Sequence, residues 1–294
     1  MPTMPNGLVP LVSALSSEAP EGVTRTEVAG GPARYRLDWA RGRQRFNVKL
    51  ALDGGRLLVW TAFYHHIIKK GAIAFDMRLD SGLGVMPHSV HILPGSYSLA
   101  AAGGNYMASF VVECESAVYS LSDAQVAAYG LSATTLPAGM VPTIAAYSFA
   151  GPDGVERDQL GGGAAGYALQ WARGTQRFNC TFILTATQFA AWSVWFHRLI
   201  AKGSRTFNMR LDSGTGPDVH AATIVPGTYS SARTGGTATV VSFIVEAEPT
   251  IYEYTAADAQ VIIDLHNAYG DTQFALLARL AQFANVDTNV LDFP

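Results

Sequence analysis

Cysteine is scarce in this chain of 294 residues, which has only Cys114 and Cys180. Two isolated cysteines cannot build a disulfide framework, so reduced thiols in a protein assembled in the cytosol are expected. Long apolar runs are also missing: no stretch of 18 apolar residues occurs, which excludes a membrane-spanning helix. The opening residues, MPTMPNGLVP, lack a positive segment followed by an apolar one, so no signal peptide is expected.

Charge is low as well, since 15% of the residues are charged and the net charge is −3. A surface that binds nucleic acid would be basic, so sequence-specific binding of nucleic acid is not expected. Hydrophobic residues make up 49% of the chain, and the mean hydropathy is +0.16. This composition is apolar for a soluble monomer, and excess apolar surface is usually covered by a partner. We therefore expect an oligomer.

Motifs of common enzymes are absent, including Gly-x-Ser-x-Gly, His-Glu-x-x-His, the phosphate-binding loop and the dinucleotide fingerprint. The histidines include His65 and His66, which are adjacent on a predicted helix. Their side chains would point about 100° apart and could not chelate a metal as an i, i+4 pair does. We expect no catalytic residue, no cofactor and no metal site.

What the chain does contain is a long internal repeat. The segment YRLDWARGRQRFN (35–47) returns as YALQWARGTQRFN (167–179), 132 positions later. About 30 of the 64 positions in 35–98 are identical to their counterparts without a gap, and SFVVECE (109–115) then matches SFIVEAE (242–248). A period of this length indicates whole domains rather than solenoid units.

The repeat predicts two tandem β domains. The segment LSATTLPAGMVP between them is rich in Ser, Thr, Pro and Gly, as linkers are. The predicted division is a first domain at 1–130, a linker at 131–142, a second domain at 143–255 and a C-terminal helical extension at 256–294.

One amphipathic helix is predicted in each repeat, because an apolar stripe at helical spacing runs through 55–71 and through its copy. The stripe consists of Trp60, Phe63, Tyr64, Ile67 and Ile68, and in the copy of Trp192, Trp195, Phe196, Leu199 and Ile200. Asp53 and Thr185 are the expected N-caps, and Gly71 and Gly203 are the expected C-terminal glycines.

Strands are predicted where apolar and polar residues alternate, at 35–39, 46–52 and 75–79, with two more at HILPGSYSLA and YMASFVVECE. Each repeat therefore reads as a β-sandwich or barrel crossed by one amphipathic helix, and the fold class is mainly β. One or two helices are expected after the second repeat, followed by an extended end. The second of these helices presents Leu276, Leu277, Leu280 and Phe283 on one face.

The string Leu-Asp-Ser-Gly occurs at 79–82 and again at 211–214. A doubled loop of this kind is found in two-lobed aspartic peptidases, which need two carboxylates about 3 Å apart sharing a proton. Residues two apart in a strand share a face, so Arg78 and Arg210 are expected beside Asp80 and Asp212, keeping both ionised. A strand-ending turn held by aspartate and glycine is the simpler interpretation.

Two other repeated patterns are candidates for function. The glutamates of 113–115 and 246–248 could form a carboxylate pair for sugar cleavage, but on one side of a strand they are expected to be solvated. The Trp-Ala-Arg-Gly string could stack arginine on indole, and its tryptophan more often lies in a core or a subunit contact. The candidate subunit contacts are Trp39, Arg41, Trp171, Arg173, Phe274, Leu277 and Phe283.

The order strand, strand, aromatic-striped helix, Phe-x-Met-Arg-Leu and a closing Ser-Phe-x-Val-Glu strand resembles the minor-tail and distal-tail proteins of long-tailed bacteriophages. The resemblance is carried by RFNVKLAL, WTAFYHHIIKKG, AFDMRL and SFVVECE with their copies, within 35–115 and 167–248. It implies β-sandwich subunits with a flanking helix that form rings at the end of the tail tube, without catalytic residues.

The resemblance further implies a structural virion protein of the phage tail or baseplate, assembled in the bacterial cytoplasm. Tail tubes of such phages look six-fold and the hub or fibre below them three-fold. A homotrimeric ring of two-domain chains would offer six similar surfaces between the tail-tube protein and the hub or fibre protein. The alternatives are a non-viral duplicated assembly or binding module and a two-lobed aspartic-type peptidase.

Overall fold

The structure is a computed structural model that describes residues 1–11, 16–18, 20, 22–28, 31–143, 148–150, 155–158, 165–170, 172–234, 238–272 and 279. It divides into two compact units, Met1–Pro249 and Thr250–Pro294. Within the larger unit, residues 1–130 are called the first half and residues 131–249 the second half. The smaller unit is called the C-terminal unit. The predicted domain boundaries stay a prediction.

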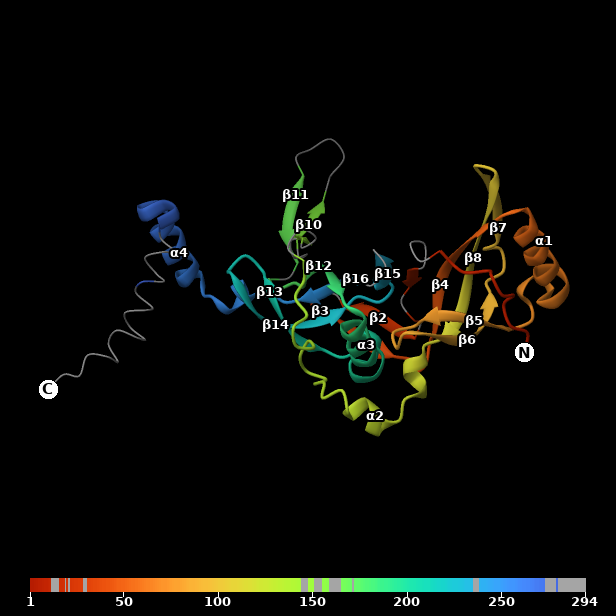
Figure 1. Ribbon diagram of the computed structural model, residues 1–294. Coiled ribbons are helices and arrows are strands. Elements are labelled where there is room, and N and C mark those ends of the chain that lie inside the picture. The colour runs from red at the N-terminus through yellow and green to blue at the C-terminus, as the bar shows by residue number, and fades with distance from the viewer. Residues whose placement is uncertain are drawn as a thin grey trace. The chain divides into compact units, whose positions relative to one another are not determined.

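The protein is mainly β, with 42% of the described residues in strands and 27% in helices, as the alternating patterns predict (Figure 1). Helices in the described part of the chain are all too short or too polar to cross a membrane. The elements of the first half are β1 (Ser16–Glu18), β2 (Val23–Val28), β3 (Gly31–Leu37), β4 (Arg43–Leu52), α1 (Gly54–Ala62), η2 (Phe63–Ile67), η3 (Lys69–Gly71), β5 (Phe75–Asp80), β6 (Val85–Ile92), β7 (Ser98–Ala102), β8 (Asn105–Glu115), η4 (Ala117–Ser120) and α2 (Asp123–Ala127).

The described elements of the second half follow the same order. They are β9 (Ser148–Ala150), β10 (Val155–Asp158), β11 (Gly166–Leu169), β12 (Gln176–Leu184), α3 (Ala186–Val194), η6 (Trp195–Leu199), η7 (Ala201–Gly203), β13 (Phe207–Asp212), β14 (Pro217–Ile224), β15 (Ser230–Thr234) and β16 (Ala238–Ala247). The C-terminal unit contains η8 (Thr250–Glu253), α4 (Ala256–Tyr269) and η9 (Gly270–Thr272).

Each half builds its core between a sheet and its helix. The inward residues of β4 alternate with exposed or half-buried ones, and in the first half Trp60 of α1 stacks on Phe110 of β8 with ring centroids 5.0 Å apart. In the second half Trp192 of α3 stacks on Phe243 of β16 at 5.1 Å. Both tryptophans are fully buried, so the aromatic stripe predicted from the sequence fixes each helix on its sheet.

The predicted helices are interrupted by a wider turn. Asp53 and Thr185 cap α1 and α3 as expected, but each α-helix passes into a π turn, η2 or η6. In η2 the amide of Ile68 donates to the carbonyl of Phe63, five residues back. The extra residue rotates the following positions around the axis. The prediction that Ile67 lies on the buried stripe is therefore wrong, because its side chain is 50% exposed.

Two strand predictions also need correction. HILPGSYSLA is not one strand: β6 ends at Ile92, and a turn in which the Ser96 amide donates to the Leu93 carbonyl leads into β7. The proline and glycine between them break the ladder, as these residues do. The strand expected over 35–39 ends at Leu37, before Trp39.

A single 12-stranded sheet crosses both halves, in the order β13-β14-β16-β15-β1-β4-β8-β6-β5, with β7, β12 and β9 beside this path. The hairpins β2–β3 and β10–β11 form two further sheets of two strands each. In both halves the longest strand, β8 or β16, pairs with three others of its own half. The only described strand that bridges the halves is β1.

In the C-terminal unit, α4 begins with a capping box in which Thr255 and Asp258 bond each other's backbone amides. None of its residues is buried, and the apolar side chains of Val261 and Ile263 are each more than half exposed. The predicted second helix and the extended end lie outside the described residues, apart from Arg279, which is helical.

Candidate functional site

Strand β1 joins the two halves with only three residues. On one edge Ser16 and Ser17 pair with Asn47 and Phe46 of β4. On the other edge Ser16, Ser17 and Glu18 pair antiparallel with β15 at positions 232, 231 and 230. The hydroxyls of Ser17 and Ser231 are buried and share a hydrogen bond of 2.7 Å. The sheet is thus continuous across what we call the junction, the contact between the first half and the second half.

A charged clamp also joins the two halves. The hairpin β2–β3 of the first half reaches the second half, where Glu246 of β16 is almost fully buried. Arg25 donates to both carboxylate oxygens of Glu246, at 2.6 and 3.0 Å, and the hydroxyl of Tyr35 donates to it at 2.5 Å. Arg177 of β12 adds a third donor at 2.8 Å. The two-oxygen geometry is the strongest form of arginine–carboxylate pairing.

The clamp keeps Glu246 ionised. Burial alone would raise the pKa of the Glu246 carboxyl, but hydrogen bonds from Arg25, Tyr35 and Arg177 outweigh burial and lower it below 4.5. The pKa of the Tyr35 hydroxyl is raised, first by burial and then by its bond to the carboxylate. The prediction that Glu246 lies on a solvated face is therefore wrong, because the first half covers it. Its counterpart Glu113 is ion-paired with Arg45 at 2.9 Å and remains partly exposed.

A second set of contacts closes the helical side of the junction. The hydroxyl of Tyr119, in η4, and Nδ1 of His197, in η6, are 3.1 Å apart. Arg198 donates to the Leu121 carbonyl at 2.8 Å and to the Asp123 carboxylate at 2.6 Å. Burial, and to a smaller extent the nearby charge of Lys202, lowers the pKa of His197 to about 3. The imidazole is therefore neutral in the folded protein at pH 7.

An apolar cluster also spans the two halves. It joins Val118 and Val126 of the first half to Val194 at the end of α3. Val118 and Val194 are completely buried. The first half thus places η4 and α2 on the helix of the second half.

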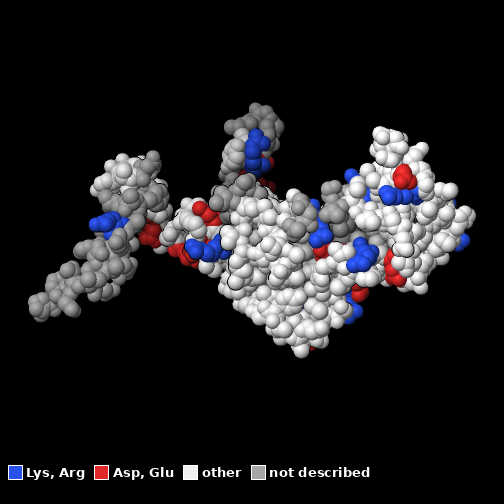
Figure 2. All heavy atoms as spheres, viewed as in Figure 1, with Lys and Arg blue, Asp and Glu red and all other residues white. Residues whose placement is uncertain are grey.

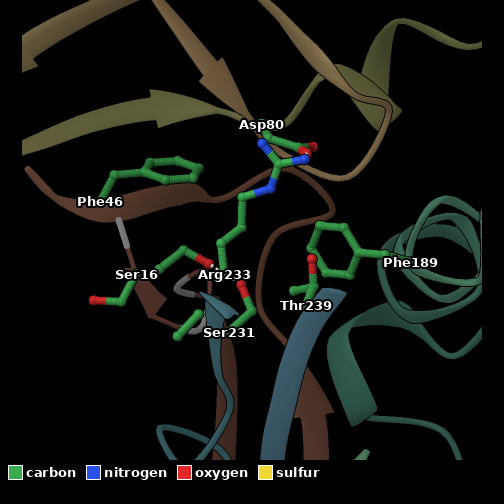
Figure 3. Close-up of a pocket in the computed structure, with 9 residues that line it drawn as sticks. Ser16, Phe46, Asp80, Phe189, Ser231, Arg233 and Thr239 are labelled. Atoms are coloured by element: carbon green, nitrogen blue, oxygen red, sulfur yellow. Dashed lines mark hydrogen bonds and ion pairs between the residues drawn. The ribbon is translucent and has the colours of Figure 1, made fainter. Parts of the chain in front are cut away.

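The first Asp-Ser-Gly loop also belongs to the junction (Figure 3). Asp80 lies 3.7 Å from a guanidinium nitrogen of Arg233 on β15, in a cavity lined from both halves. The open space is about 10 Å³, roughly the room of one water molecule. A methyl group added to Gly82 would collide with the Ser193 side chain of α3. The guanidinium expected from Arg78 is instead supplied by Arg233, and Arg78 reaches the Val85 carbonyl at 3.5 Å.

Both repeated aspartates hold turns. Oδ1 of Asp80 accepts the amides of Gly82 and Gly84, at 3.0 and 3.2 Å. Oδ1 of Asp212 accepts the amides of residues 214 and 216 in the same way, at 2.9 and 3.2 Å. The strands that carry them, β5 and β13, stand at opposite ends of the strand order. Each carboxylate stabilises the turn that follows its own strand.

The candidate contact residues are partly placed at this junction. The Trp39 carbonyl accepts a 2.7 Å hydrogen bond from the Lys202 ammonium, although the indole is 56% exposed. Arg41 and Arg173 each form an ion pair within their own half, at 3.6 Å to Glu115 and 2.5 Å to Glu248. Trp171, Phe274, Leu277 and Phe283 lie outside the described residues.

The sequence did not identify Arg25 and Tyr35 as functional residues. They lie in a hairpin, and only their contacts with Glu246 give them a role. The one signal in the sequence is that the tyrosine and the glutamate recur in both repeats. The two cysteines are free, as expected, and both are buried, which raises the pKa of both thiols to about 12. No group of three metal-ligating side chains occurs within the described part of the chain.

No protein-family model matches the chain, and no curated protein matches it.

Proposed function

We propose that the chain is a structural virion protein of a phage tail tip, built from two tandem homologous β domains. Three copies would form a ring that joins a six-fold tail tube to a three-fold hub. The proposal rests on the resemblance carried by the repeated strings of 35–115 and 167–248, together with one observation of the structure. That observation is the junction itself.

The junction is a contact between different faces. The first half contributes β1, the β2–β3 hairpin and η4–α2, whereas the second half contributes the β15 edge, Glu246 and η6. Contacts of this head-to-tail kind repeat from unit to unit and close into rings when the rotation allows. Because each chain carries two similar halves, a closed ring of three chains would present six similar domains. The low charge of the surface in Figure 2 is consistent with a protein that works inside an assembly.

The ring is tested by native mass spectrometry and rotational class averages of the full chain. We expect a closed assembly of three chains of 31.3 kDa each, with six similar lobes around a hollow axis. A stable monomer at all accessible concentrations would refute the proposal. Binding of the ring to an isolated tail tube, but not to a tube already capped, would extend it to the adaptor role.

The peptidase alternative has its own test. We expect Asp80→Asn and Asp212→Asn each to lower stability by about 1 kcal/mol, because each carboxylate accepts two backbone amides. We expect no acid-pH cleavage of a denatured protein substrate that depends on these residues. Cleavage that disappears in the double variant would favour the peptidase over the ring.

A further inference from the structure

We propose that neighbouring chains join by repeating the internal junction, with the second half of one chain bound to the first half of the next. The pairing partners are the open edge of β9 and the open edge of β7. This inference rests on the ring of the proposed function and names its chain-to-chain contact. It follows from what each half still exposes after the internal junction has formed.

The two open edges match the two edges already joined. Strand β9 lies on β12 as β1 lies on β4, even to the hydrogen bond from Asn179 to Ser148 that repeats the one from Asn47 to Ser16. Among the described strands β9 pairs only with β12, and β7, whose residues are all exposed, pairs only with β8. An open edge of this kind is a template for another strand.

The internal register fixes the register between chains. Ser16 pairs with Ala232 inside the chain, and a shift of 132 positions converts this pair into Ser148 with Ala100. The next two pairs become 149 with 99 and 150 with 98. Leu99 is 44% exposed, whereas the equivalent Ser231 is buried at the junction.

The residues that form the clamp have counterparts in the other half. In the β10–β11 hairpin, Nε of Arg157 donates to the Tyr167 hydroxyl at 3.3 Å, as Nε of Arg25 donates to Tyr35 in β2–β3. Tyr167 is 71% exposed, and the β10–β11 strands carry no buried residue. The counterpart of the buried Glu246 is Glu113. Glu246 of β16 pairs with an arginine of β12, and Glu113 of β8 pairs with an arginine of β4. We assign Arg157 and Tyr167 of one chain to Glu113 of the next.

The helical side of the junction also has a second copy. The C-terminal unit repeats η4–α2 as η8–α4, and Ile251 and Val261 occupy the places of Val118 and Val126. The two copies differ in burial, because Val118 and Val126 are buried whereas Ile251 and Val261 are 41% and 56% exposed. On the receiving side, Ile67 of η2 is 50% exposed. We therefore assign the first half of a second copy as the partner that covers Ile251 and Val261.

The second Asp-Ser-Gly loop completes the correspondence. A methyl group at Gly82 would collide with Ser193 across the junction, whereas one at Gly214 would meet nothing within 4 Å. Residue 61, the counterpart of Ser193, is exposed on α1. The space at Gly214 is the space that α1 of the neighbouring chain would fill.

The test is a disulfide between chains. Ala100→Cys combined with Ser148→Cys places two thiols at paired strand positions, where the Cα separation suits a disulfide. We expect mild oxidation of the full chain to give covalent oligomers on a non-reducing gel, about tenfold more than Ala102→Cys with Ser148→Cys, which is out of register. Ser16→Cys with Ala232→Cys is the positive control, because it should close within one chain.

The outcomes separate the contact from the ring. In-register oligomers that stop at three chains support both, and open ladders of unlimited length support the contact but overturn the closed ring. A ring seen by native mass that gives no in-register crosslink overturns the contact and leaves the proposed function standing. A monomer without crosslinks overturns both. Arg157→Ala, which should weaken assembly without unfolding the chain, provides the second readout.

Discussion

Replacing Arg25 with alanine removes the two-oxygen donor from a buried carboxylate and tests the junction directly. The side chains of Arg25 and Glu246 are 17% and 3% exposed, so solvent screens their interaction weakly. A hydrogen bond to a charged group contributes about 1.5–3 kcal/mol, and a buried carboxylate left without its partner costs about 3–5 kcal/mol. Arg177 and Tyr35 remain on the carboxylate in the variant. We therefore expect a loss of about 2–3 kcal/mol.

The measurement is equilibrium urea unfolding followed by tryptophan fluorescence, at a concentration low enough to keep the chain monomeric. Arg157→Ala is the matched control, since Arg157 makes the same bond to a tyrosine hydroxyl in an exposed hairpin. We expect the control to change the free energy of unfolding by less than about 0.5 kcal/mol. Equal losses in the two variants would refute the assignment of the Arg25–Glu246 pair as a contact that holds the halves together.

Three further outcomes are expected from the same junction. The pKa of His197 is lowered from 6.5 to about 3, so the unfolded state binds the proton first. The unfolding free energy should therefore fall as pH drops below 6.5, and it should fall less in His197→Gln. The pKa of Glu246 lies below 4.5, so its contribution is present above that pH and lost as pH falls through the lowered value; acid titration of unfolding should show this step in wild type but not in Glu246→Gln. Gly82→Ala should lower the unfolding free energy by about 2–5 kcal/mol, because alanine at positive φ is strained and its methyl group would collide with Ser193. Gly214→Ala should lower it by only about 1–2 kcal/mol, from the positive φ alone. Similar melting temperatures of the two variants would contradict the close approach of Gly82 to Ser193.

Local structure followed from local pattern. The stripe around Trp60 and the alternation in 46–52 predicted α1 and β4, and both formed because their apolar residues face one core. The caps at Asp53 and Thr185 were predictable because a capping side chain acts on amides within three residues. The π turn was not predictable from hydrophobic spacing, because the pattern assumes a constant rotation per residue. Ile67 was placed on the wrong face for that reason.

The site needed distances that a pattern does not contain. Glu246 reads as one of two alternating glutamates on an outward face, and its burial depends on Arg25, which is 221 positions away in the chain. Likewise β1 is too short to show alternation, so the strand that joins the halves carries no periodic signal. The repeat predicted two like domains, because segments of the first half recur about 132 positions later, but it did not locate the contacts between them.

The hydrogen bond between Ser17 and Ser231 spans 214 positions, so it can form only after the second half has been synthesised. At about 5–20 residues per second, the β15 edge leaves the ribosome roughly 10–40 s after β1. During that interval the first half has its own core and pairs β1 with β4, but the other edge of β1 has no partner. A strand of three residues offers few backbone groups to a foreign strand that lacks the other contacts of the junction, so its shortness protects the nascent chain. The same brevity that hides β1 from sequence patterns thus keeps a half-made protein from pairing with its neighbours on the polysome.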